Sequence, residues 1–430
     1  MLNLPAVLLP QVYADRLAAS GKDSGLLDIR FDEAEQLAVV DGLREGRAGT
    51  RRAGLSEVPR SHHLAYASSE ADSALWFRVD PVLHIGGMEA ARRGGAISIK
   101  TFREHIPSGD WIVPGRGGFT LAVTVGRVEE IDEASFAAWR IHAEHDVVEA
   151  VPLDLAAEAP DPFESLKGVW PVGELVDRRF LLVGAGSIGG AAADALARYA
   201  VRRLVVVDPD RLSSRNLARH LLGADQLGRY KVNGLADNLR QRSPQIEVKP
   251  LALDVIYDAD IVRALLEEID CVVVTSDGVE SRRAANHLAR RAGKPTVFAC
   301  VLADGAFGEV LRVRPPRTGC LLCARAELMA NGAMNPEPTL DRGYGTGTRH
   351  LPMTAVGGDL ALVGQLAAKV AVATMLESLG YLEQRLPGDH AVLALQPKPD
   401  MSPPFDIDRA CELTWRELPE PRSGCRTCGV

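Results

Sequence analysis

The sequence predicts an α/β protein in which a doubly wound domain with a four-cysteine zinc knuckle follows a smaller α+β domain. Three observations support this fold class. From Phe180 onward, apolar strand-like segments alternate with helical ones, a pattern typical of βαβ units on a parallel sheet. A glycine-rich loop follows the first of these strands, and two C-x-x-C pairs stand late in the chain. The length of 430 residues suits two or three domains.

Composition excludes several classes of protein. Hydrophobic residues make up 46% and charged residues 25%, as in folded soluble proteins. The formal net charge of −8 argues against nucleic acid as the main partner. Because no uninterrupted apolar run reaches about 18 residues, we expect no membrane span. The N-terminus lacks the basic segment of a signal peptide. Seven cysteines that include two C-x-x-C pairs favour metal binding in the cytoplasm over a disulfide framework.

The first 160 residues contain no motif that identifies their chemistry. We expect a helix over residues 31–47 and strands at 75–79, 111–113 and 119–125. The acidic, proline-containing segment 154–164 is typical of a linker, which predicts domains of residues 1–160 and 161–430.

The second domain is predicted to alternate strands with helices. Strands are expected at 180–186, 204–208, 246–254, 271–276 and 295–302, and helices at 189–200, 228–242, 259–268 and 280–292. The stretch 330–358, rich in Gly, Pro, Asn and Thr, is predicted to be a long loop before a very apolar helix over 359–379. From residue 391 onward we expect two short strands and the knuckle.

The glycine loop, residues 184–189, has the pattern G-x-G-x-x-G between an apolar strand and an Ala-rich helix. In such loops Gly184 makes the turn, Gly186 lets a phosphate approach the backbone, and Gly189 allows close helix packing. Asp208 ends the next strand, where a carboxylate can accept hydrogen bonds from ribose hydroxyls. By itself the pattern favours a dinucleotide enzyme, and a glycine turn with no ligand is the simpler alternative.

Further polar residues follow Asp208. They provide a second carboxylate, an amide, an arginine and a lysine, and another carboxylate follows the fourth strand; these are Asp210, Asn216, Arg219, Lys231 and Asp277. Each alone is typical of a solvated surface. Together they suit a nucleoside triphosphate, because Arg and Lys neutralise phosphate charge and carboxylates hold ribose and Mg²⁺.

These motifs resemble the ThiF–MoeB–ubiquitin-activating-enzyme superfamily over residues 165–430. The resemblance rests on GAGSIGG, DPDRLSSRNLARH (family pattern D-x-D-x5-N-L-x-R-Q), GRYK, TSDGVESR and both C-x-x-C pairs, in the family's order. In that family, ATP adenylates the C-terminal glycine carboxylate of a ubiquitin-like or sulfur-carrier protein. The resemblance implies that Asp208 holds the ribose, that Asp277 holds Mg²⁺, and that the phosphates are bound by Asn216, Arg219 and Lys231.

The cysteine pairs predict a structural Zn²⁺ site. Each C-x-x-C offers two thiolates on one turn, and two pairs complete a closed tetrahedral site formed by Cys320, Cys323, Cys425 and Cys428. A redox pair is the alternative, disfavoured because neither pair follows a strand into a helix. We expect Cys271, Cys300 and Cys411 to be small buried residues.

The sequence departs from the family in two places. Thioester-forming members carry a cysteine before the long C-terminal helix, whereas residues 324–377 contain none. The reaction therefore stops at the acyl-adenylate or a hydroxyl accepts the acyl group as an oxyester. The candidate hydroxyls, with Thr348 and Thr354 preferred, are those of Thr339, Thr346, Thr348 and Thr354. Loop polarity and helix capping are the alternative roles of these threonines. The R-Y-x-R-Q segment of MoeB-like dimers is also missing, and neither Arg178 nor Arg179 can be assigned its role.

The leading hypothesis is the activating enzyme of a bacterial ubiquitin-like conjugation pathway, a homodimer that uses ATP, Mg²⁺ and Zn²⁺. Its partners would be a ubiquitin-like protein ending in Gly and a conjugating-enzyme-like protein. The N-terminal domain would bind a partner or be an inactive adenylation-like half. The alternatives are an activator of a sulfur carrier or of a peptide-antibiotic precursor, a non-catalytic scaffold, and a nicotinamide oxidoreductase. Partner-dependent ATP–pyrophosphate exchange separates these classes.

Overall fold

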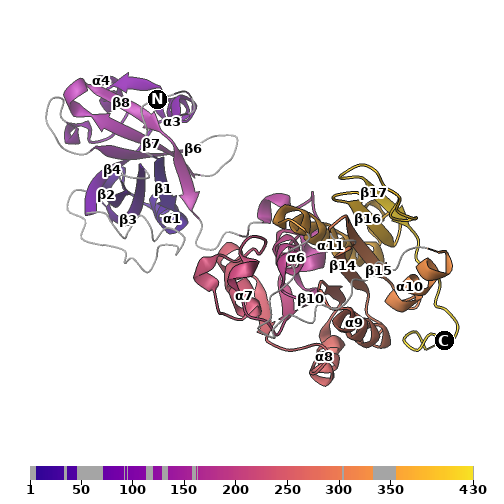
Figure 1. The fold of residues 1–430 in the computed structure, drawn as a ribbon. Helices are drawn as coiled ribbons and strands as arrows, with labels where there is room; N and C mark the ends of the chain where they lie inside the picture. Colours follow the sequence, from indigo (N-terminus) through magenta and orange to yellow (C-terminus); the bar gives the residue numbers. More distant parts are fainter. Residues whose placement is uncertain are drawn as a thin grey trace. The chain divides into compact units, whose positions relative to one another are not determined.

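The computed structural model describes residues 6–32, 36–45, 71–91, 93, 95–112, 120–127, 134–156, 161, 163–302, 305–332 and 355–429. The chain divides into two compact units, Met1–Pro160 and Asp161–Val430 (Figure 1). Each unit has its own β-sheet and is described by itself.

The N-terminal unit contains a nine-stranded mixed sheet in the order β5-β8-β7-β6-β4-β2-β3-β1-β9. Its strands are β1 (Ala6–Pro10), β2 (Ser24–Asp32), β3 (Leu37–Glu45), β4 (Ala71–Arg78), β5 (Ala96–Ser98), β6 (Leu121–Arg127), β7 (Ala134–His142), β8 (Val147–Val151) and β9 (Leu153–Ala156). Side chains alternate between the two faces of a strand. Neighbouring residues of β4 therefore enter different cores: Trp76 packs with Tyr13 of α1 (Gln11–Ala19), and Phe77 packs with Phe102 of α4 (Ile99–Glu104).

Two expectations for this unit are wrong. Among the described residues 31–32 and 36–45, the helix expected over residues 31–47 is instead the end of β2 and the whole of β3, which pair antiparallel. Val39 and Val40 are completely buried there, and such pairing with a distant strand overrides a local helical pattern. The strand expected at 111–113 begins inside the 3₁₀ turn η3 (Gly109–Trp111). The strands expected at 75–79 and 119–125 are confirmed as parts of β4 and β6. The segment expected to be a linker begins inside β9, which pairs with β1.

The C-terminal unit contains an eight-stranded sheet in the order β12-β11-β10-β13-β14-β15-β16-β17. The first five strands are parallel and the last three antiparallel. They are β12 (Glu247–Leu251), β11 (Arg203–Val207), β10 (Arg179–Val183), β13 (Cys271–Val274), β14 (Thr296–Leu302), β15 (Phe307–Val313), β16 (His390–Ala394) and β17 (Leu413–Arg416). The expected α/β class is confirmed, because the chain proceeds outward from β10 in one direction and then returns to β13 on its other side.

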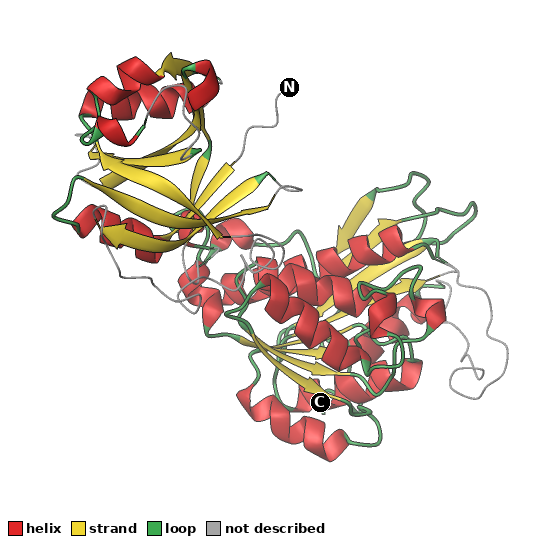
Figure 2. Ribbon diagram, turned by 90° about the vertical axis from the view of Figure 1, so that its left-hand side faces the viewer, coloured by secondary structure: helices red, strands yellow, loops and turns green. Residues whose placement is uncertain are grey.

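Helices cover both faces of this sheet (Figure 2). On one face lie α6 (Ser187–Arg198), α7 (Lys231–Arg242) and α11 (Gly357–Ser378), and on the other α8 (Ala259–Leu265), α9 (Val279–Arg291) and α10 (Leu321–Ala330). All five strands and four helices expected between residues 180 and 302 are confirmed, with ends that differ by up to three residues. The apolar helix and the two late strands are also confirmed, as α11, β16 and β17.

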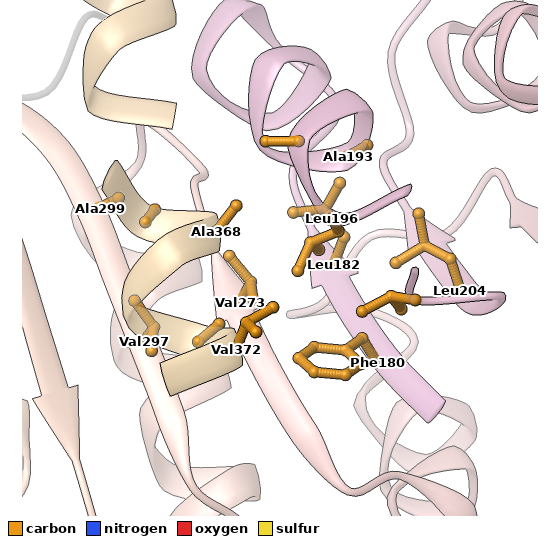
Figure 3. Close-up of a cluster of buried hydrophobic side chains, with 14 of the residues drawn as sticks. Phe180, Leu182, Ala193, Leu196, Leu204, Val273, Val297, Ala299, Ala368 and Val372 are labelled. Atoms are coloured by element: carbon orange, nitrogen blue, oxygen red, sulfur yellow. The ribbon is translucent and has the colours of Figure 1, made fainter. Parts of the chain in front are cut away.

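The largest core lies under α6 and α11. Phe180 and Leu182 of β10 pack there with Leu196 of α6 and with Ala368 and Val372 of α11 (Figure 3). The two helices approach closely, because a Cβ on Gly364 would lie 2.4 Å from the carbonyl oxygen of Ile188. Within the described part of the chain, α11 alone has the length and hydropathy of a membrane span, yet 67% of its most apolar window is buried, as in a core helix.

Candidate functional site

The glycine loop lies at the carboxyl end of β10, where the order of the strands reverses. The N–H of Gly184 donates to the carbonyl of Val207 at the end of β11 (2.8 Å), and the N–H of Thr275 donates to the carbonyl of Val183 (2.8 Å). The Thr275 hydroxyl donates to the carbonyl of Gly184 (2.8 Å). The ends of three neighbouring strands thus hold the loop at the position where doubly wound sheets bind ligands.

The three glycines meet different spatial demands. Gly184 has φ +100°, and a Cβ there would lie 2.8 Å from the backbone N of Ser276. A Cβ on Gly189 would lie 2.0 Å from the carbonyl oxygen of Gly184. Gly186 has no described heavy atom within 4 Å of such a Cβ, so the middle of the loop faces open space. The first and third glycines are therefore needed for folding, while the second leaves room for a ligand.

Asp208 is buried and already engaged with the backbone. Its Oδ2 accepts a hydrogen bond from the N–H of Ala185 (2.6 Å), and its Oδ1 accepts one from the N–H of Asp210 (2.8 Å). Burial raises the pKa of Asp208, and the nearby charge of Lys231 opposes that rise. Each carboxylate oxygen has a second lone pair, so Asp208 can fix the glycine loop and still accept a hydrogen bond from a ligand.

Asp210 and Lys231 form an ion pair at the start of α7. The Lys231 Nζ lies 2.8 Å from Oδ2 of Asp210, and the N–H of Lys231 donates to the carbonyl of Asp210 (2.9 Å). Lys231 is only 4% exposed. Two residues that are 21 positions apart in sequence therefore hold each other beside Asp208, and the ammonium is fixed in place.

Asn216 and Arg219 lie on the turn that follows. The Asn216 Oδ1 accepts from the N–H and the hydroxyl of Ser213, both at 2.9 Å, so this amide caps the 3₁₀ turn η6 (Ser214–Asn216). The Nε of Arg219 is buried with no hydrogen-bond partner among the described residues. A Cβ on Gly357, the first residue of α11, would lie 3.0 Å from the Arg219 Cα. This places the arginine beside the start of α11.

Asp277 is exposed just beyond β13. It follows Ser276, whose backbone N would lie 2.8 Å from a Cβ on Gly184, so the backbone of Asp277 comes close to the first turn of the glycine loop. The structure thus gathers the glycine loop, Asp208, the Asp210–Lys231 pair and Asp277 at one edge of the sheet.

The four candidate acceptor threonines lie outside the described residues; they are Thr339, Thr346, Thr348 and Thr354. The described chain resumes at Ala355, which packs on the main core.

The four paired cysteines meet in one cluster. The Sγ atoms of Cys320 and Cys323 are 3.9 Å apart, and those of Cys320–Cys425 and of Cys323–Cys428 are each 3.7 Å apart. All four lie within 4.8 Å of one another. A tetrahedron with Zn–S bonds of about 2.3 Å has edges of about 3.8 Å, whereas a disulfide has an S–S distance of about 2.05 Å. The cluster therefore fits Zn²⁺.

The other cysteines differ in burial. Burial raises the pKa of Cys271 to about 12 and that of Cys300 to about 11, so neither thiol is a ready nucleophile. The expectation that Cys411 is buried is wrong. It is exposed, with φ +64°, because it stands at a turn before β17 and not in a strand.

Sequence reasoning assigned no role to two residues of the loop's support, Thr275 and His220. The imidazole Nε2 of His220 lies 2.7 Å from the carbonyl oxygen of Ala185. His220 directly follows Arg219, where the family pattern has Gln, and this substitution was the available signal.

The fold and the site define a doubly wound α/β domain with a glycine loop at the strand reversal and an attached four-cysteine cluster. The chain belongs to the ThiF family, whose model matches residues 171–403.

Several known proteins are similar to this chain. The uncharacterized protein y4oA of Sinorhizobium fredii is 33% identical over 181 residues, covering 39% of this chain and 30% of that protein. Ubiquitin-like modifier-activating enzyme 5 of Oryza sativa is 25% identical over 280 residues (60% and 65%). Sulfur carrier protein ThiS adenylyltransferase of Bacillus subtilis is 30% identical over 162 residues (37% and 47%). The chain thus spans less than two thirds of each of these relatives. A structure of E. coli MccB with ATP matches at TM-score 0.43 and 17% identity, covering 60% of this chain and 68% of that one.

Proposed function

We propose that this protein uses ATP to adenylate the C-terminal glycine carboxylate of a ubiquitin-like protein. The observation that carries the proposal is the convergence of the glycine loop, Asp208, Lys231 and Asp277 at the strand reversal of a ThiF-family domain. Two of the similar proteins are named for activating a ubiquitin-like modifier and for adenylating a sulfur carrier.

In this reaction a carboxylate oxygen of the partner attacks the α-phosphorus of ATP. The new P–O bond forms as the bond to pyrophosphate breaks, which yields the acyl-adenylate and free pyrophosphate. The backbone N–H groups at the start of α6 and the guanidinium of Arg219 would bind phosphate oxygens. Asp208 would accept a hydrogen bond from a ribose hydroxyl.

Lys231 would add positive charge beside the phosphates. Its bond to Asp210 holds the buried ammonium in place at the start of α7. A cation that is fixed there would neutralise phosphate charge. Asp277 would hold Mg²⁺, which supplies further neutralisation of phosphate charge.

The adenylate needs a further acceptor if the protein works in conjugation. We propose an oxyester on Thr348 or Thr354, since no cysteine occurs between residues 324 and 377. An ester adduct between enzyme and partner would survive a thiol reductant and be cleaved by hydroxylamine. A homodimer, partner binding by the N-terminal unit, and transfer to a conjugating-enzyme-like protein complete the proposal.

Partner-dependent ATP–pyrophosphate exchange tests this function. The exchange should appear with a small ubiquitin-like protein ending in Gly, and Asp277→Ala should abolish it with the melting temperature unchanged, because Asp277 is exposed. Glu267→Ala is the matched control, an exposed carboxylate near the opposite end of β13. If a folded Asp277→Ala variant catalysed ATP–pyrophosphate exchange at the wild-type rate, Asp277 would have no part in the mechanism. Exchange only with a sulfur carrier would redirect the assignment, and no exchange with any partner would favour a scaffold.

A further inference from the structure

We propose that His220 is a positioning residue of the nucleotide site, which holds the glycine loop in the shape that receives the phosphates. The inference rests on the proposed function and adds to it a residue at which this chain departs from the family pattern. His220 does not need to touch the nucleotide, because it acts through the backbone of Ala185.

The imidazole of His220 is fully used by the surrounding backbone. Its Nε2 lies 2.7 Å from the carbonyl oxygen of Ala185, and the N–H of Leu222 donates to its Nδ1 at 3.1 Å. A carbonyl can only accept and an N–H can only donate, so the ring carries its proton on Nε2. His220 is 9% exposed, which leaves little room for water to replace either bond.

Ala185 is held on both sides. Asp208 accepts from its N–H at 2.6 Å, and His220 donates to its carbonyl. These two bonds fix the two peptide planes that flank Ala185 and therefore its backbone angles. In a trans peptide the N–H points opposite to the carbonyl, so the bond to His220 also sets the direction of the Gly186 N–H, on the open part of the loop.

The same histidine couples the loop to the turn that carries Arg219. The N–H of His220 donates to the carbonyl of Asn216 at 2.8 Å, and Arg219 is its immediate neighbour. The position of Arg219 is therefore fixed relative to the glycine loop. Glutamine, the residue of the family pattern, has an amide NH2 group that can donate and a carbonyl oxygen that can accept, so it can make the same two bonds.

Protonation should release this arrangement. A second ring proton on Nδ1 would face the N–H of Leu222 and remove that acceptor. Burial lowers the pKa of His220, as do the charges of Lys231 and Arg219 that face it, while the bond to Ala185 opposes the shift. The carboxylate of Asp208 lies on the other side of Ala185 and can also change its protonation state. The contribution of His220 to the pH dependence is therefore obtained by comparing variants.

The test compares His220→Gln with His220→Phe. Phenylalanine fills the space without a donor or acceptor, whereas glutamine restores both bonds. For the full-length protein, calorimetric titration with Mg²⁺ and a non-hydrolysable ATP analogue should give an affinity within about threefold of wild type for the glutamine variant. The phenylalanine variant should bind about tenfold more weakly, as expected for one lost hydrogen bond. Because burial lowers the pKa of His220, the affinity of wild type should fall only at pH values below the ordinary histidine pKa, and that of the glutamine variant should fall less.

Hydrogen exchange in the nucleotide-free protein provides a second readout. Exchange of the amides of residues 185–189 should be faster in the phenylalanine variant and near wild type in the glutamine variant. Unchanged exchange, or equal nucleotide affinity of wild type and the phenylalanine variant, would overturn the positioning role. If wild type fails to bind the analogue while loop exchange responds as expected, the proposed function fails and the support of the loop by His220 stands.

Discussion

The two candidate sites of the C-terminal unit are held in opposite ways. In the crevice, polar groups of the chain are partnered to one another: Asp208 with Ala185, Asp210 with Lys231, and His220 with Ala185. In the cysteine cluster the four sulfurs face one another, and the bond from the N–H of Arg422 to Cys323 (3.4 Å) is one of the weak contacts that surround them. Thiols are weak hydrogen-bond donors. The crevice is therefore arranged by the polypeptide, whereas we expect a bound metal to hold the cluster together.

The crevice and the cysteine cluster also differ in how far apart their residues lie along the chain. Most of the crevice lies within residues 184–231, so a single stretch of alternating strands and helices supplies much of it. Cys320 and Cys425 are 105 positions apart. The backbone supports this contact through the N–H of Gly319, which donates to the carbonyl of Pro419 at 2.6 Å. Loss of the metal should therefore release the C-terminal tail and leave the crevice in place.

The largest expected effect is that of zinc removal. We expect about one zinc per chain, and a melting temperature lowered by roughly 10 °C or more on chelation or in Cys323→Ser, because structural zinc contributes directly to folding free energy. Elemental analysis and scanning calorimetry measure these quantities. Cys411→Ser, an exposed cysteine outside the cluster, is the control and should change neither. A native protein that contains no metal would show this prediction to be wrong.

Substitutions in the glycine loop should separate folding from nucleotide binding. Gly189→Ala places a Cβ 2.0 Å from the Gly184 carbonyl oxygen and should cost about 1–3 kcal/mol of unfolding free energy. Gly186→Ala meets no atom and has an ordinary φ of −75°, so it should leave stability within about 0.5 kcal/mol and weaken ATP binding. Urea unfolding and calorimetric titration check both. Equal stability of the two variants would contradict the assigned roles.

The Asp210–Lys231 pair should show coupling. Asp210→Asn removes the negative charge of Asp210 from beside the buried ammonium of Lys231 and should destabilise the protein by about 1–3 kcal/mol. Adding Lys231→Met removes the positive charge and should recover part of the loss. A double-mutant cycle in urea measures the coupling free energy. Strictly additive losses would mean that the pair does not stabilise the crevice.

The smallest expected effect is a pH dependence of stability. Burial lowers the pKa of His220 in the crevice and of His84 in the N-terminal unit below 6.5. The folded state then binds fewer protons than the unfolded state, so stability should fall as pH drops below 6.5, by up to about 1.4 kcal/mol per unit for each histidine. The raised pKa of Asp208 has the opposite effect on stability. Its stabilising contribution is lost as the pH rises through the pKa of Asp208 in the folded protein. Urea unfolding at pH 7.5, 6.5 and 5.5 should show a shallower fall for His220→Gln. Parallel curves would contradict this.

The sequence by itself determined the parallel strands and helices between residues 180 and 302 and the glycine loop. It also determined that the two C-x-x-C pairs combine into one four-cysteine cluster. These features depend on periodicity and on residues close together in the chain, and a buried parallel strand such as β10 is apolar throughout. The polar residues after Asp208 are likewise near neighbours in sequence, so their common edge follows from the alternation of strands and helices.

Only the tertiary structure decided the remaining features. Residues 37–45 form a strand because β2 lies beside them, and α11 is a core helix because Gly364 lets it pack on α6. The role of His220 depends on a carbonyl 35 positions earlier, a contact that no local pattern encodes. Hydrogen bonds and burial act across space, so a residue whose partners are distant in sequence acquires its role only when the chain folds.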